Sequence, residues 1–106
     1  MRIIGTIVEE ESGKPLAGLQ VRAFDKDLIF DDKLGTSVTD AKGNFRIDFS
    51  SINFSLMQDI DTVPDVYVRV FDASGKKLLF TSEKAIRKQE GVEERFDISI
   101  SKTKLS

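Results

Sequence analysis

With 106 residues, the chain is long enough for one hydrophobic core and short for two, so we expect a single domain spanning residues 1–106. It has no cysteine and no histidine, which excludes disulfides, thiolate catalysis and the commonest ligands of zinc, copper and iron. The formal net charge of -2 comes from sixteen basic and eighteen acidic side chains mixed along the chain, so nucleic acid is a poor candidate partner.

No run approaches the roughly 20 apolar residues that a membrane helix needs, so no membrane span is expected. Met1 leads straight into polar and β-branched residues without the hydrophobic segment of a signal peptide. We therefore expect a cytosolic protein, a mature product or a domain of something larger, and the compartment stays open.

The first half of the chain has four segments with the period-two alternation of β-strands. They are residues 2–10, 19–25, 34–39 and 44–49, separated by turns rich in glycine, proline and aspartate. In the fourth segment Phe45, Ile47 and Phe49 should face the core while Arg46 and Asp48 face water.

Residues 50–64 contain scattered apolar side chains without a sustained period. Three structures are open: a cover over one end of the core, a short helix around residues 54–60, or a poorly ordered edge. We favour the cover, because leaving this much apolar surface in water is costly.

The second half predicts three more strands, at residues 65–72, 77–82 and 93–101. In the middle one, Leu78 and Phe80 should point inward. Residues 82–91 should form a solvated connection with one helical turn, anchored to the core by Ile86, and residues 102–106 should be a frayed tail. Seven short strands without a long helical pattern predict an all-β protein, a two-sheet β-sandwich.

Four motifs resemble the transthyretin-like, or carboxypeptidase regulatory-domain-like, superfamily of Greek-key sandwiches. They are residues 5–8 (GTIV), 13–18 (GKPLAG), 21–25 (VRAFD) and 39–45 (TDAKGNF). The resemblance implies a seven-stranded Greek-key β-sandwich of the transthyretin-like (prealbumin-like) type. Each motif serves a turn or a strand, so the resemblance implies a fold and says little about activity.

The enzymes of that superfamily do not fit this chain. The hydroxyisourate hydrolases use histidines and a carboxy-terminal Tyr-Arg-Gly-Ser motif, whereas this chain has no histidine and ends Lys-Thr-Lys-Leu-Ser. Intradiol dioxygenases bind iron through two tyrosines and two histidines, and Tyr67 is the only tyrosine here. We therefore expect no enzymatic activity and no catalytic residues.

Aspartates gather between the second and third predicted strands, where Asp25, Asp27, Asp31 and Asp32 supply the oxygen ligands that calcium prefers. The segment resembles the aspartate-rich part of nematode transthyretin-like secreted proteins and the calcium loops of synaptotagmin-type domains. The alternative, which we favour, is that these aspartates cap turns and keep a loop soluble. Asp40, in a Thr-Asp-x-x-Gly hairpin signal, should be structural.

Two functions remain. We expect no cofactor for the first, and calcium is the one cofactor expected for the second. The first is a non-enzymatic binding or accessory module that recognises a protein or carbohydrate partner through its loops or an edge strand. The second is a calcium-dependent ligand- or lipid-binding domain using residues 25–32. The row Tyr67, Arg69 and Phe71 is a further candidate, either as an exposed recognition strip or as a covered part of the fold.

Overall fold

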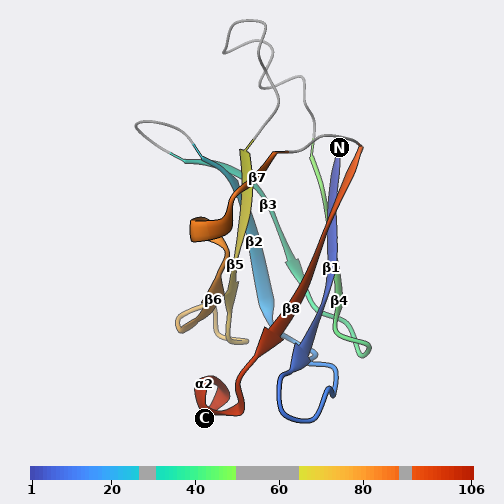
Figure 1. Ribbon diagram of the computed structural model, residues 1–106, viewed down its shortest axis with the longest axis vertical. Coiled ribbons are helices and arrows are strands. Elements are labelled where there is room, and N and C mark those ends of the chain that lie inside the picture. Colours follow the sequence, from blue (N-terminus) through green and yellow to red (C-terminus); the bar gives the residue numbers. More distant parts are fainter. Residues whose placement is uncertain (27–30, 50–64, 89–91) are drawn as a thin grey trace, which may run out of the picture.

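The computed structural model describes residues 1–26, 31–49, 65–88 and 92–106, and in these ranges most of the chain is β-strand. The strands form two sheets (Figure 1). The three-stranded sheet has the order β4 (Asn44–Asp48), β1 (Arg2–Glu9) and β8 (Glu93–Ile100). The five-stranded sheet has the order β3 (Asp32–Val38), β2 (Gln20–Asp25), β5 (Asp65–Phe71) and β6 (Leu78–Thr81), and the two-residue β7 (Arg87–Lys88) also pairs with β5. The predicted all-β, two-sheet class is confirmed, and all seven predicted strands are present within two residues of their expected bounds.

The centre of the three-stranded sheet is β1, which pairs antiparallel with β4 and parallel with β8. The parallel pair runs over the full length of both strands, from Arg2 opposite Glu93 to Glu9 opposite Ile100. The first and last strands of the chain are therefore tied together, and the two termini lie at opposite ends of the long axis (Figure 1).

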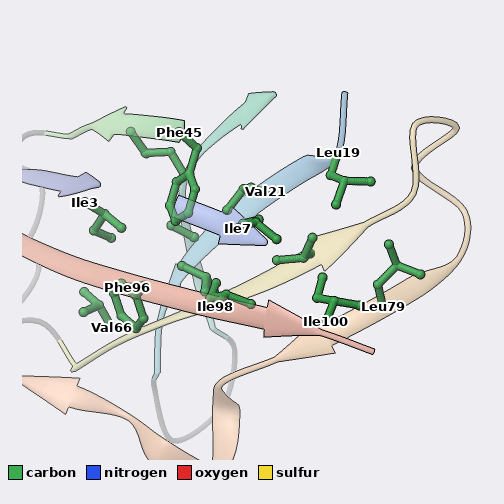
Figure 2. Close-up of a cluster of buried hydrophobic side chains, with 14 residues drawn as sticks. Ile3, Ile7, Leu19, Val21, Phe45, Val66, Leu79, Phe96, Ile98 and Ile100 are labelled. Atoms are coloured by element: carbon green, nitrogen blue, oxygen red, sulfur yellow. The ribbon is translucent and has the colours of Figure 1, made fainter. Parts of the chain in front are cut away.

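One hydrophobic core lies between the two sheets, built from alternate residues of the strands (Figure 2). The three-stranded sheet contributes Ile3, Ile7, Phe45, Ile47, Phe96, Ile98 and Ile100. The five-stranded sheet contributes Val21, Ala23, Val66, Val68, Val70 and Leu79. Each fully buried aliphatic side chain stabilises the fold by roughly 1.5–3 kcal/mol, so this shared core holds the two sheets together.

Gly5 lies in the middle of β1, on the face that points into this core. A side-chain carbon placed there would come within 2.6 Å of the Phe45 ring and would also collide with the carbonyl oxygen of Phe96. The absence of a side chain at this position is what lets Phe45 cross over β1.

The structure corrects the inward-facing residues predicted in β6. A bulge in the pairing of β5 with β6, between Val70 and Phe71, shifts the alternation by one residue. Leu79 is therefore buried, Leu78 is 47% exposed, and Phe80 packs against the margin of the core. Period-two reasoning fails at this strand because a bulge sets two residues against one.

The connection after β6 contains the expected helical turn, a 3-10 helix η1 at Glu83–Ala85. Ile86 is exposed and does not anchor it, which corrects the prediction. The buried Ser82 does so, since its hydroxyl accepts a hydrogen bond of 2.9 Å from the Val68 N–H. Residues 89–91 of this connection lie outside the described ranges.

The predicted frayed tail is a short helix, α2 (Lys102–Leu105), which is a second correction. The Ser101 side chain caps it at the Thr103 N–H, Glu11 accepts from the Lys102 N–H at 2.9 Å, and Leu105 packs against the core. Among the described residues, no helix has the length and apolarity to cross a membrane. The predicted cover at residues 50–64 lies outside the described ranges.

Candidate functional site

The five-stranded sheet has a second face that points away from the core, which we call the outer face. Strand pairing arranges its side chains in three rows that run across the strands. The first row is Val38, Gln20, Phe71 and Leu78; the second is Thr36, Arg22, Arg69 and Thr81; the third is Lys33, Phe24 and Tyr67. The outer face therefore mixes aromatic rings, cations and exposed apolar side chains.

Aromatic rings and guanidinium groups stack on one another across β2 and β5. The rings of Phe24 and Tyr67 are stacked with centroids 5.2 Å apart. The Arg69 guanidinium lies 5.2 Å from the Phe24 centroid and 5.5 Å from that of Tyr67, and the Arg22 guanidinium lies 4.0 Å above the Phe71 ring. Such cation–π contacts fix the positions of long side chains that would otherwise move freely.

A polar network continues the third row toward η1. Tyr67 is only 1% exposed, and its hydroxyl donates a hydrogen bond to the Asp31 carboxylate. Lys26 lies between two carboxylates, 3.0 Å from Glu83 and 3.5 Å from Asp31. Arg69 completes the chain of contacts at 2.7 Å from Glu83.

Protonation equilibria in this network are shifted in the directions that these contacts require. Burial raises the pKa of Tyr67, and its hydrogen bond to Asp31 raises it further. The hydrogen bond from Arg69, followed by that from Lys26, lowers the pKa of Glu83. The hydrogen bonds with Glu83 likewise raise the pKa values of Arg69 and Lys26. The network is thus held as ion pairs, with the phenol neutral.

A hollow of about 180 Å³ opens on the outer face between β2 and β3. It lies where the register of these strands shifts between Ala23 and Phe24, a bulge that leaves Leu34 without a paired residue. Its lining is Arg22, Ala23, Phe24, Lys33, Gly35 and Thr36. Two of these residues are cations, and among the described residues neither is within ion-pair distance of a carboxylate.

The first row gives the outer face an apolar end. Val38 is 57% exposed, Leu78 is 47% exposed, and Phe71 lies between them across Gln20. Single exposed apolar residues are common on protein surfaces, but here two of them share a row with a half-buried aromatic ring.

The predicted calcium ligands occupy different environments. Asp25 is 5% exposed at the end of β2, where its carboxylate accepts the Asp65 N–H at 2.9 Å. Asp31 accepts from Tyr67 and Lys26, Asp32 begins β3 opposite Asp25, and Asp27 lies outside the described residues. Within the described ranges, no group of three or more acidic side chains is arranged to hold a metal ion. Calcium binding by residues 25–32 and turn capping by these aspartates both stay predictions, because the contacts described above for Asp25 and Asp31 join them to Asp65, Tyr67 and Lys26 and are not caps of a local turn.

The two turn aspartates have clear structural roles. The Asp40 carboxylate accepts from the N–H groups of Lys42 and Asn44, both at 2.9 Å, as expected for a hairpin turn. Asp72 accepts from the Ser74 hydroxyl at 2.7 Å and from the backbone N–H groups that follow, and these bonds lower its pKa.

The row Tyr67, Arg69 and Phe71 is neither a fully exposed strip nor a fully covered one. Tyr67 is buried, whereas Arg69 and Phe71 are half-buried on the outer face. The residues that sequence reasoning missed are Arg22 and Lys33, which line the hollow. Period-two alternation puts Arg22 on the face of β2 that points away from the buried Val21, but nothing in the sequence showed that Lys33 of β3 would line the same hollow.

Comparisons with known proteins inform the fold alone. No family model matches the chain, and no curated protein matches it. Among solved structures it is similar to a 9R-lipoxygenase from Cyanothece PCC8801, with a TM-score of 0.62 and 20% identity over 94% of this chain and 16% of the lipoxygenase chain. It is also similar to an alternative pilotin of the type II secretion system of Vibrio cholerae, with a TM-score of 0.53 and 14% identity over 95% of both chains. At these identities the likeness shows the fold alone, because one fold serves many functions.

Proposed function

We propose that this protein is a non-enzymatic β-sandwich module that recognises a partner protein through the outer face of its five-stranded sheet. The observation that carries the proposal is the first row, where Val38 and Leu78 are about half exposed beside the ring of Phe71. Aromatic and arginine side chains are enriched at protein interfaces, and Arg22 and Arg69 stand in the next row. The sequence left carbohydrate open as a partner, and the exposed aliphatic side chains favour protein.

The finer fold belongs to the same proposal. We infer a transthyretin-like Greek-key sandwich, built from the seven predicted strands with the two-residue β7 as an addition, from the order of the four motifs. The observed turns support this inference, because Gly13, Gly18 and Gly43 all have positive φ angles of 73° to 79°. A non-enzymatic role is supported by a sequence without histidine or cysteine, which lacks the usual general base and the usual thiol nucleophile.

Site-specific cross-linking tests the proposal. A photoreactive phenylalanine analogue at Leu78 should cross-link to a specific protein in cells of the source organism, and the same analogue at Val92 should not. Val92 is the matched control because it is an exposed apolar residue beside the other sheet.

The captured protein should then be purified and titrated with variants of this chain. The Val38→Lys, Leu78→Lys double variant should bind about tenfold more weakly, and Val92→Lys should bind like the unmodified protein. Equal affinity of the double variant would rule out the outer face. Specific capture of a glycan in place of a protein would show that the partner class is wrong.

A further inference from the structure

We propose that the hollow between β2 and β3 receives a carboxylate, the side chain of a glutamate or aspartate on the partner protein. This inference deepens the proposed function and rests on it, because it names the group that the outer face selects. The hollow adjoins the apolar first row, so the recognised surface is an acidic side chain next to apolar ones.

Charge balance on the outer face points to an anion. Arg69 contacts Glu83, and Lys26 contacts both Glu83 and Asp31, so these two cations are matched by two carboxylates. Arg22 and Lys33 line the hollow and have no ion pair with any described carboxylate. Two unmatched cations beside one cavity create a positive potential that a bound carboxylate would neutralise.

Arg22 is held ready for such a ligand. Its guanidinium lies over the Phe71 ring, and its Nη2 donates to the Gln20 side-chain oxygen and to the Gly75 carbonyl, both at 3.1 Å. Both acceptors are neutral, and among the described residues the Nε and Nη1 groups make no hydrogen bond. Both Nη2 hydrogens are used by these acceptors, so Arg22 would bind a carboxylate through a single charge-assisted hydrogen bond from Nε or Nη1, and Lys33 would supply the second positive charge.

The other walls of the hollow complete a small polar site. Lys33 is exposed at its rim and supplies a second, flexible positive charge, and the Thr36 hydroxyl is a hydrogen-bond donor opposite Arg22 in the strand pairing. Phe24 forms an apolar wall whose position is set by its stacking on Tyr67. A volume of about 180 Å³ suits a single side chain.

The source of the carboxylate is a protein because of what adjoins the hollow. Thr36 and Arg22 stand in the second row, directly beside Val38 and Gln20 of the first row along β3 and β2. A partner that places an acid in the hollow must therefore lay neighbouring groups on Val38 and Phe71. Apolar side chains gain from that contact, whereas the hydroxyls of an acidic sugar would lose water without finding a partner.

Nuclear magnetic resonance of the full ¹⁵N-labelled chain tests the inference with a defined probe. The probe is a blocked pentapeptide with glutamate between leucine and valine, and its control has glutamine in place of glutamate. The glutamate peptide should shift the amide signals of Ala23, Lys33, Gly35 and Thr36 and bind about tenfold more tightly than the glutamine peptide at low salt. Equal binding of the two peptides, or no binding of either, would overturn the carboxylate site.

Three variants locate the binding charge. Lys33→Gln and Arg22→Gln should each weaken the glutamate peptide about threefold to tenfold. Arg46→Gln removes the same charge from the other sheet, where Arg46 is paired with Asp48, and should leave binding unchanged. Lys33 is exposed and makes no described contact that the fold needs, so its variant remains informative even when Arg22→Gln is unstable. An equal loss in all three variants would show a general charge effect and no site.

The inference and the proposed function can fail separately. Cross-linking at Leu78 together with equal binding of both peptides would keep the module and discard the carboxylate site. Peptide binding in the hollow without any protein cross-linked at Leu78 would discard the proposed function. Tighter binding of an oligogalacturonate than of the glutamate peptide would show that the carboxylate belongs to a carbohydrate and would overturn the choice of source.

Discussion

The outer faces of the two sheets differ in how their arginines are matched. On the three-stranded sheet each arginine has a carboxylate beside it: Arg46 lies 2.8 Å from Asp48, Arg95 lies 3.0 Å from Asp97, and Arg2 contacts both Asp48 and Glu93. On the five-stranded sheet Arg22 and Arg69 lie over aromatic rings, and of these two only Arg69 has a carboxylate partner among the described residues.

The difference separates a solvated face from a face suited to recognition. Exposed ion pairs contribute little to stability and leave no net charge for a partner to read. Cations that are stacked on rings and lack a matching carboxylate keep both their charge and their orientation. Two sheets that share one core can therefore serve different purposes, and four changes would break or sharpen this contrast.

The largest effect is expected at Gly5, on the inner face of the three-stranded sheet. Gly5→Ala would place a carbon against the Phe45 ring and the Phe96 carbonyl, and both the β1–β4 and the β1–β8 pairs would have to move. We expect a loss of about 3 kcal/mol in the free energy of unfolding, measured by urea denaturation. A loss below about 1 kcal/mol would mean that β1 packs less closely than described.

The next effect is expected at Tyr67, which links the outer face to the aspartate loop. Tyr67→Phe keeps the stacking on Phe24 and removes the hydroxyl that donates to Asp31. The free energy of unfolding should fall by about 1.5 kcal/mol, because a hydrogen bond to a charged group is lost. An unchanged value would indicate that solvent replaces the phenol at Asp31.

A matched pair of arginine variants compares the two outer faces directly. Arg69→Gln loses the contacts with Glu83 and with two rings, and should lower stability by about 1 kcal/mol. Arg46→Gln loses one exposed ion pair and should have almost no effect in the same denaturation experiment. Equal effects of the two changes would remove the contrast between the faces.

The smallest effect is a pH dependence carried by Glu83. The hydrogen bonds from Arg69 and then from Lys26 lower the pKa of Glu83 in the folded protein from its usual value of 4.5. The stabilisation that these contacts give the fold is therefore fully present above pH 4.5. It is lost as the pH falls through the lower, folded-state pKa. The difference in Tm between the unmodified protein and Glu83→Gln should therefore be constant near neutral pH and shrink in acid.

Asp48 on the other sheet is the comparison for Glu83. Its pKa is also lowered, by Arg46 and Arg2, but its side chain is 57% exposed, so Asp48→Asn should show a weaker trend. A difference for Glu83→Gln that grows in acid would contradict the proposed ion pairs.

The sequence by itself determined the strands and most of the turns. Alternating β-branched and aromatic residues in β1, β2, β5 and β8 leave only one way to bury one face of each strand. Turn chemistry is local, so Asp40 and Gly43 could be assigned from their spacing alone. The absence of histidine and cysteine limits the available chemistry in the same way, because it is a property of composition and holds for any fold.

Only the tertiary structure decided those side-chain orientations and neighbours that depend on how each strand pairs with another. The bulge opposite Phe71 turned Leu78 outward, and the cap at Ser101 made a helix of a tail that looked frayed. The bulge between β2 and β3 set Lys33 opposite Phe24, so that Lys33 lines the same hollow as Arg22, although eleven positions separate the two cations in the sequence. Pairing register and bulges arise from contacts between segments that are distant in the sequence, and the period-two pattern within one strand does not specify them.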